Sequence, residues 1–282
     1  MRWASRMPTS GVSARQAAMQ IENPGPWQRS GRLAGDGQAT ASRRELRLYG
    51  VNAVRAMFAR RPEALRKLYL SHGRAGAFAD LMKWCAAHRI GYRLVDEDDL
   101  RRLAASSHHE GVVADVVREP LQPLPDWLAE LPEGPCCAIW LDGVGNPHNL
   151  GAILRNAAHF GVSAVLLPRH SPLQLSGAAA RVAEGGAEAV SWVQMSDGAI
   201  ALQALRAAGF TLAATLVAGG DDVFATALPE RLVYVLGAEQ TGMNRTLAES
   251  CDLRLSIPGT GRVESLNVAS ATAVLLAAWA RR

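Results

Sequence analysis

The chain has 282 residues and a formal net charge of +4, with 49% apolar and 20% charged residues. This length exceeds one ordinary domain and the apolar fraction suffices for a normal core, so two folded units with irregular flanks are expected. No apolar run reaches the roughly 18 to 20 residues that span a bilayer. The longest run, at 271–280, ends at Arg281, which excludes a membrane protein.

The cysteines indicate neither a zinc site nor a disulfide framework. Cys85, Cys136, Cys137 and Cys251 form no C-x-x-C pair, and two of them are sequence neighbours that could hardly bind one ion together. We therefore expect no metal, and a reducing cytoplasm is the simplest compartment.

Positive charge is concentrated in the first half of the chain. Residues 1–45 include seven basic and three acidic residues. Residues 46–118 include thirteen basic and eight acidic residues. Residues 119–135 hold four acids and no base, and 136–282 hold ten basic and eleven acidic residues. This asymmetry suits a phosphate-bearing partner such as nucleic acid, although a solvated surface often carries an excess of this size.

Residues 1–45 are expected to form a disordered basic arm. They are rich in Arg, Ser, Gly and Pro and show no sustained period of 2 or 3.6. No apolar segment follows the first arginines, so the arm is not a secretory signal. An Arg-rich, acid-poor start also resembles a mitochondrial transit peptide, but a disordered arm or a start codon placed too early is favoured.

Residues 46–118 are expected to form a small α/β unit. The pattern predicts helices at 51–60, 77–88 and 98–105 and strands at 67–71, 92–95 and 111–117. Five prolines among the seventeen residues of 119–135 then predict a linker.

Residues 136–282 are expected to form a second unit in which strands and helices alternate. The pattern predicts strands at 136–141, 164–167, 189–193, 211–215, 232–236 and 253–257, and helices at 149–160, 176–184, 199–208, 244–249 and 267–281. Such alternation favours a mainly parallel sheet covered on both faces. The last helix is apolar almost all round, which predicts burial on every side.

Three segments of the second unit combine into one pattern. They are NLGAILRNA at 149–157, VLGAEQTGM at 235–243 and IPGTGRVESLNV at 257–268. In this order and spacing they resemble the SpoU (TrmH) family of RNA ribose 2′-O-methyltransferases, over about residues 138–280. The first unit resembles that family's substrate-binding domain at YGVNAV (49–54) and HEGVV (109–113), although the family often has Gln where Glu110 stands.

The resemblance implies a fold, a cofactor and a reaction. The fold is an α/β-knot (SPOUT) domain with a deep trefoil knot, a rare exception to the rule that chains do not thread themselves, preceded by a small ribosomal-protein-like α/β domain that binds RNA. The cofactor is S-adenosyl-L-methionine and the enzyme is a homodimer. A guanosine of 23S-type rRNA is favoured as substrate over tRNA because the two-domain layout resembles the rRNA branch. The alternative is a non-catalytic RNA-binding or ribosome-assembly factor.

The resemblance also assigns site residues, each of which has a plainer explanation. The catalytic candidates are Arg155, Asn149, Glu239, Ser265 and Asn267; the cofactor-binding candidates are Thr215, Gly237, Ile257, Gly261 and Leu266; and the RNA-binding candidates are Asn52, His109 and Arg155. Helix capping alone would explain Asn149, Gly161, Ser265 and Asn267, and Glu239 could merely begin a turn. The presence of all five catalytic candidates favours an enzyme over a binding factor.

Arg155 is the candidate whose interpretation depends most on the family. On a wheel of 100° per residue, Leu150, Ile153 and Ala157 share an apolar arc and Arg155 lies opposite, which by itself indicates a solvated arginine. The resemblance instead implies that Arg155 helps to deprotonate the ribose hydroxyl. A guanidinium with a pKa above about 12 is a poor base. We therefore favour the hypothesis that an RNA phosphate relays the proton while Arg155 stabilises the developing alkoxide.

Overall fold

The computed structural model describes residues 45–238 and 242–281. The predicted basic arm lies outside the described residues, apart from Glu45. The first unit contains the strands β1 (Glu45–Tyr49), β2 (Leu65–Ser71), β3 (Gly91–Val95) and β4 (Val112–Val117), the helices α2 (Val51–Arg60), α3 (Ala79–Ala87) and α4 (Glu97–Ala104), and the 3-10 turns Pro62–Ala64 and His72–Arg74.

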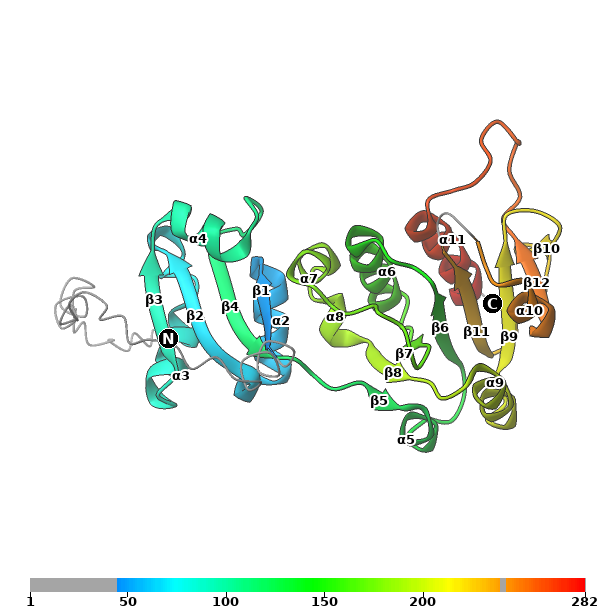
Figure 1. Ribbon diagram of the computed structural model, residues 1–282, viewed down its shortest axis with the longest axis horizontal. Coiled ribbons are helices and arrows are strands. Elements are labelled where there is room, and N and C mark those ends of the chain that lie inside the picture. The colour runs from blue at the N-terminus through cyan, green and yellow to red at the C-terminus, as the bar shows by residue number, and fades with distance from the viewer. Residues whose placement is uncertain (1–44, 239–241, 282) are drawn as a thin grey trace, which may run out of the picture. The chain divides into compact units, whose positions relative to one another are not determined.

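The first sheet has the strand order β1-β4-β2-β3 (Figure 1), in which β2 and β3 are parallel and the other pairs antiparallel. Residues of α2 and α3 cover one face, where Val54 and Leu81 pack against Leu68. On the other face, Leu100 of α4 packs against Tyr69. The strand β1 was not predicted, because it has only five residues, two of which, Glu45 and Arg47, are charged and exposed.

The second unit contains one larger sheet. Its strands are β5 (Gln122–Pro123), β6 (Cys136–Asp142), β7 (Ala164–Leu167), β8 (Ser191–Gln194), β9 (Thr211–Leu216), β10 (Asp221–Asp222), β11 (Arg231–Gly237) and β12 (Leu253–Ser256), and its helices are α5 (Leu124–Ala129), α6 (Pro147–His159), α7 (Gly177–Ala183), α8 (Gly186–Ala189), α9 (Gly198–Ala207), α10 (Arg245–Ser250) and α11 (Val268–Ala280). The strand order is β10-β12-β9-β11-β6-β7-β8-β5, and every neighbouring pair is parallel. The α/β fold with a parallel sheet is confirmed.

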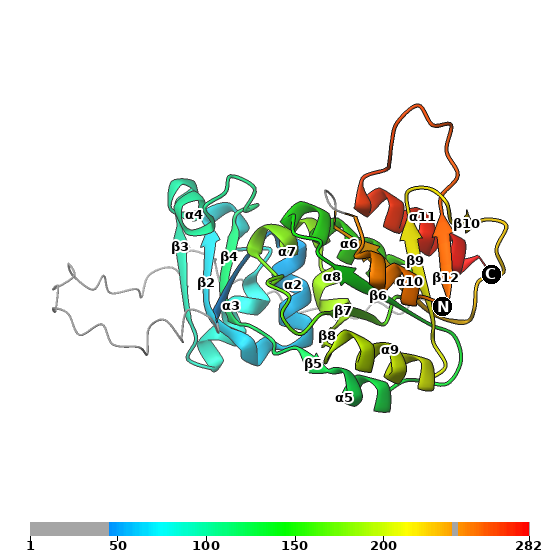
Figure 2. The ribbon, with the colours of Figure 1, turned by 45° about the vertical axis from the view of Figure 1, so that its right-hand side comes forward.

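Helices cover both faces of this sheet, as the alternation of elements predicted. Along β6, Ile139 points into a core shared with α6, α7 and α11, whereas Trp140 points into a core shared with α5 and α9. Helix α11 packs against α6, and the segment between β12 and α11 extends away from the sheet as a long exposed loop (Figures 1 and 2). The loops that follow the strands of this parallel sheet come together at its carboxyl edge.

The segment predicted as a linker contributes structure to the second unit. Strand β5 pairs with β8, and α5 begins with a proline in its first turn, where the missing N–H costs nothing. Leu124 and Trp127 of α5 are buried, and the Trp127 ring stacks on Phe210. High proline content was therefore a poor guide to the absence of structure in this segment.

The helices differ from the predicted ones in three details. Asn146, and not Asn149, caps α6 by accepting a hydrogen bond from the His148 amide at 2.9 Å. The helix predicted at 176–184 corresponds to α7, whereas the short helix α8 that follows it was not predicted; Glu184 and Gly185, which both have positive φ, separate the two. Helix α11 was expected to be buried all round, yet Ser270, Ala277 and Ala280 are exposed in a single chain.

All four cysteines are free and buried. Burial raises the pKa of the Cys251 thiol to about 11, so this group is unreactive near neutral pH. None of the described helices is both long enough and apolar enough to cross a bilayer. In the same part of the chain, no group of three or more His, Cys, Asp or Glu side chains could hold a metal ion.

Substitution of Gly151 tests the close packing of α6 on α7. A Cβ atom at this position would lie 2.5 Å from the Ala179 carbonyl oxygen and 2.6 Å from Val182 Cβ. Gly151→Ala should therefore lower the free energy of unfolding by about 1 to 3 kcal/mol, because the helices must separate. Gly198→Ala, at a helical glycine with no atom within 4 Å, is the control and should be neutral or stabilising by less than about 1 kcal/mol. Urea unfolding measures both, and equal effects would contradict the packing argument.

Candidate functional site

A cavity of about 1110 Å³ lies at the carboxyl ends of β6, β9, β11 and β12. Its wall consists of the loops that follow these strands, the long loop before α11, and part of α11 itself. In parallel sheets this edge is the usual position of a ligand site, because the connecting loops meet there. Volumes of about 300 to 1,000 Å³ hold drug-sized molecules, so this cavity can take a nucleoside-sized ligand with room beside it.

Most of the candidate residues from the three motifs meet at this cavity. It is lined by Asn149, Thr215, Gly237, Ile257, Gly261, Ser265, Leu266 and Asn267. Glu239 lies outside the described residues. Three segments that are far apart in the sequence thus contribute to one site, although the catalytic or binding role of each residue stays a prediction.

Asn267 joins the long loop to the start of α6. Its Nδ2 donates a hydrogen bond to Asn149 Oδ1 at 3.0 Å, and its Oδ1 accepts the Ala269 amide at 2.9 Å and so caps α11. About two turns further along α6, Asn156 Nδ2 donates to the Ala269 carbonyl at 3.0 Å. The carboxyl-terminal segment is therefore held to α6 at two points, and one of them lies in the cavity wall.

Glycine allows a close backbone approach at the end of β11. Ala238 and Gly242 exchange two backbone hydrogen bonds of 3.0 Å, which hold Gly242 against the end of β11. A Cβ atom on Gly237 would lie 2.6 Å from the Gly242 carbonyl carbon and would also collide with the Met243 backbone. Beside this turn, the Thr215 hydroxyl donates to the Val235 carbonyl at 2.8 Å. Close backbone packing at Gly237 therefore shapes this part of the wall, which Leu236, Ala238 and Met243 also line.

Among the described residues that line the cavity, one side chain is negatively charged and none is positively charged. Glu264, in the long exposed loop, is the charged group in this set. Arg155 is exposed on α6 and does not line the cavity. It follows Asn149 by six residues, which places it roughly 240° around the helix. The structure thus separates Arg155 from the other candidates of its own chain.

The two remaining RNA-binding candidates have partners within the protein. Asn52 Nδ2 donates to Glu184 Oε2 at 2.6 Å. His109 is 4% exposed, and its Nδ1 accepts the Gly111 amide at 3.1 Å. Contact of either residue with RNA stays a prediction.

Sequence reasoning missed several lining residues. Asn146 and Glu264 both line the cavity but were not assigned a role. Asn146 follows β6 within a short loop, and this position after a parallel strand was the signal that could have identified it. Glu264 lies inside the third motif, where only its neighbours were singled out.

Comparison with known proteins identifies the family. The model of the SpoU rRNA methylase family matches residues 137–277, and a model described as RNA 2′-O ribose methyltransferase substrate binding matches residues 47–122. The uncharacterized tRNA/rRNA methyltransferase YfiF of Escherichia coli O157:H7 is 37% identical over 238 residues, covering 84% of this chain and 68% of that protein. The 23S rRNA (guanosine-2′-O-)-methyltransferase RlmB of Neisseria meningitidis serogroup B is 34% identical over 232 residues, covering 81% of this chain and 92% of that protein.

Solved structures share the fold. The AdoMet-bound rRNA methyltransferase from Sinorhizobium meliloti aligns with a TM-score of 0.72 at 22% identity, over 86% of this chain and 90% of that one. The SpoU methyltransferase AviRb from Streptomyces viridochromogenes, in complex with AdoMet, aligns with a TM-score of 0.70 at 23% identity, over 88% of this chain and 94% of that one.

Fold and cavity thus define an α/β enzyme with a ligand site at the carboxyl edge of a parallel sheet. The chain belongs to the SpoU rRNA methylase family. The enzyme class that the motifs implied, an RNA 2′-O-methyltransferase, is confirmed at the level of the family.

Substitution of Gly237 tests the role of its backbone in ligand binding. Gly237→Ala should weaken binding of S-adenosylhomocysteine at least about tenfold, because the new Cβ pushes the backbone of the cavity wall apart. Gly259→Ala, at another glycine of the same wall with no atom within 4 Å, should change the affinity less than about twofold. Isothermal titration calorimetry measures both, and equal affinities for the two variants would contradict the assignment.

Proposed function

We propose that this protein transfers the methyl group of S-adenosyl-L-methionine to the ribose 2′-hydroxyl of a guanosine in 23S-type rRNA. The observation that carries the proposal is the meeting of the three family motifs in one cavity. The substrate is supported by relatives at 34–35% identity that are named 23S rRNA (guanosine-2′-O-)-methyltransferases. Four free, buried cysteines support a reducing compartment, which we propose is the cytoplasm.

The residues present fit this methyl donor. Leu236, Leu255 and Leu275 give the cavity apolar wall suited to an adenine ring. The backbone around Gly237 offers donors and acceptors, and Glu264 offers a negative charge that complements a sulfonium. When bound, the cofactor supplies an activated methyl group. Gly237, Ile257 and Leu266 would hold it largely through their backbone groups.

The chemical task left to the protein is to orient the ribose and to ease loss of its hydroxyl proton. Holding reacting groups in alignment can supply about 7 to 11 kcal/mol of a barrier. Asn149 and Asn267, fixed to each other by a hydrogen bond, would orient the ribose together with Ser265. The Arg155 guanidinium would stabilise the developing alkoxide while an RNA phosphate accepts the proton, so that no neutral arginine is required.

We further propose that two copies of the chain complete one site. In a single chain Arg155 is exposed and does not line the cavity that holds Asn149. Helix α11 contains no charged residue from Val268 to Ala280, yet part of its surface is exposed. A second copy would bury this apolar surface and bring its own Arg155 to the site.

The proposal also concerns the path of the carboxyl-terminal segment through the fold. We propose that the carboxyl-terminal segment forms the deep trefoil knot implied by the resemblance. Support comes from the path of the chain, which pairs β12 with β9, continues through the long loop of the cavity wall, and returns to α6 at Asn156 and Asn149.

Methylation of defined RNAs tests the reaction. The purified protein with tritiated S-adenosylmethionine should label an unmodified transcript of Escherichia coli 23S rRNA, with the label mapped to a guanosine 2′-oxygen. Because the relative at 37% identity is named a tRNA/rRNA methyltransferase, bulk unmodified tRNA forms the second arm. Label in tRNA alone would contradict the rRNA assignment and identify tRNA as the substrate. Binding of rRNA without label in either arm would favour the non-catalytic factor.

Mixed dimers test whether Arg155 acts across the two copies. Arg155→Ala and Asn267→Ala should each abolish activity as homodimers. A heterodimer of the two, isolated by two affinity tags, should regain about half of the wild-type turnover, because one of its two sites then holds both native groups. If Arg155 served its own chain, each site of the heterodimer would lack one group and activity would stay absent.

A further inference from the structure

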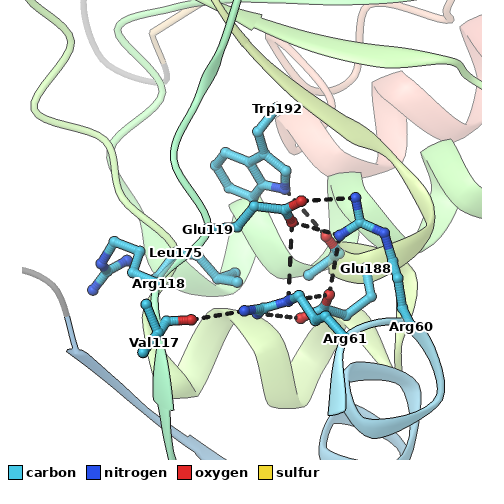
Figure 3. Close-up of polar contacts among 9 residues, drawn as sticks. Arg60, Arg61, Val117, Arg118, Glu119, Leu175, Glu188 and Trp192 are labelled. Carbon is cyan, nitrogen blue, oxygen red and sulfur yellow. Dashed lines mark hydrogen bonds and ion pairs between the residues drawn. The ribbon is translucent and has the colours of Figure 1, made fainter. Parts of the chain in front are cut away.

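A buried ion pair joins the part of the chain that matches the substrate-binding model to the methyltransferase part. Arg61, directly after α2, donates from Nε to Glu188 Oε2 at 2.8 Å and from Nη2 to Glu188 Oε1 at 2.7 Å. Its Nη1 donates to the Val117 carbonyl at 2.7 Å. Figure 3 shows the guanidinium held between these acceptors. Arg61 is 8% exposed and Glu188 9%, so both charges are removed from solvent.

Such a pair fixes geometry more than it adds stability. Burial of Arg61 favours its neutral form, but the hydrogen bonds and charge of Glu188 outweigh this, so the pKa of Arg61 lies above its ordinary value. Desolvation of two charges offsets much of their attraction, whereas the two parallel hydrogen bonds permit only one relative orientation. The pair therefore specifies how the two parts of the chain meet.

A second layer of charges surrounds this pair. Arg60 donates from Nη2 to Glu119 Oε1 at 2.9 Å and from Nη1 to Glu188 Oε2 at 3.3 Å. Glu119 lies two residues after the end of β4, where the chain leaves the first sheet (Figure 3). Arg118 donates from Nη1 to the Leu175 carbonyl at 2.6 Å. The end of the first unit is thus held at the junction on both sides of Arg61.

A further ionic cluster lies on α7. Arg181 contacts Glu110 of the first unit at 2.5 Å and Glu184 at 2.5 Å. Glu110 also accepts the Val51 amide at 2.8 Å, at the start of α2, and Asn52 donates to Glu184 at 2.6 Å. The junction is therefore held at two separate places, one on α7 and one on α8.

Both of these short helices pack directly on α6, the helix that carries Arg155 and Asn149. On the α8 side, a Cβ atom at Gly186 would lie 2.7 Å from the Leu154 carbonyl oxygen and 3.1 Å from Arg155 Cα. Gly186 is only two residues from Glu188. The chain of contacts thus runs from Arg61 through Glu188 and the α8 backbone to the backbone of Arg155.

We propose that Arg61 and Glu188 are positioning residues for the methyl transfer, which fix the substrate-binding unit on α8 and so set which ribose of a bound RNA reaches Arg155. This inference rests on the proposed function. A unit that only delivered RNA would work on a flexible tether. The buried ion pair of Arg61 with Glu188 instead holds the substrate-binding unit against α8, next to Arg155. It therefore fixes the distance between the surface that binds RNA and the ribose that reacts.

Kinetics of Glu188→Gln and Arg61→Met test the proposal. With the 23S rRNA transcript, each variant should lower kcat about ten- to hundredfold, because small misplacement of a bound substrate has effects of this size. The KM for RNA and the affinity for S-adenosylhomocysteine should change less than about twofold, since neither binding surface is altered. The fraction of methyl groups at the main guanosine should also fall. The double variant should be no worse than either single one, because both remove the same contact.

Arg101→Gln is the matched control. Arg101 forms an exposed ion pair with Asp98 on α4 of the same unit, and loss of such a pair should leave kcat and the methylated site unchanged. Normal kcat and an unchanged methylated site in the folded Arg61 and Glu188 variants would overturn the proposal, as would a loss of activity matched by a loss of S-adenosylhomocysteine binding.

Small-angle X-ray scattering of the same proteins gives a readout independent of activity. The radius of gyration should increase in Glu188→Gln and Arg61→Met but not in Arg101→Gln, because the first unit is released from α8. An unchanged radius would contradict the fixed junction. If the wild-type protein methylated no RNA, the proposed function would fail while this measurement still tested the junction.

Discussion

The close packing of α6 against its neighbours is the constraint on which the rest of the structure depends. Gly151 and Gly186 let α7 and α8 approach its backbone to distances that a methyl group would prevent. On its other side, Asn149 and Asn156 receive the carboxyl-terminal segment through hydrogen bonds of 3.0 Å. One helix therefore forms part of the cavity wall at its first turn, holds the end of the chain, and bears the contacts that lead to the first unit. A change in its position would disturb all three together.

The distribution of charge around α6 follows from this arrangement. The face that packs on the sheet must be apolar, so Arg155 can only lie on the outer side, away from the cavity of its own chain. The described wall of that cavity offers a carboxylate and backbone groups, which suit a cationic methyl donor, but no cation to stabilise an alkoxide. Binding of the donor and activation of the ribose are thus assigned to different surfaces of the same helix, and only an assembly in which these surfaces meet can carry out both.

The periodicity of the sequence was sufficient to predict the parallel sheet, because the alternation of strands and helices is a local feature. That Asn149, Gly237 and Asn267 belong to one site came from the family resemblance, and the structure places all three at one cavity. The direction of Arg155 was also correct on the helical wheel, but its relation to the cavity depends on how α6 is oriented on the sheet, which no local pattern encodes. The order in 119–135 was missed for a similar reason, since β5 exists only through its pairing with β8. The contact between Arg61 and Glu188 spans 127 positions and leaves no periodic signal.

Glu110 shows how a contact between residues far apart in the sequence can explain a departure from the family's usual residue. The family often has Gln at this position, and a neutral amide could accept the Val51 amide equally well. In this chain the carboxylate also faces Arg181, whose aliphatic stem lies where a side chain on Gly50 would be. Glu184 already offers one carboxylate to the half-buried Arg181 from the methyltransferase part, and Glu110 adds a second from the first unit, so that the arginine also forms an ion pair across the junction. The acidic residue is therefore best understood as part of the junction and not as a weakened RNA contact, because its charge would repel a phosphate but stabilises the docking of α7.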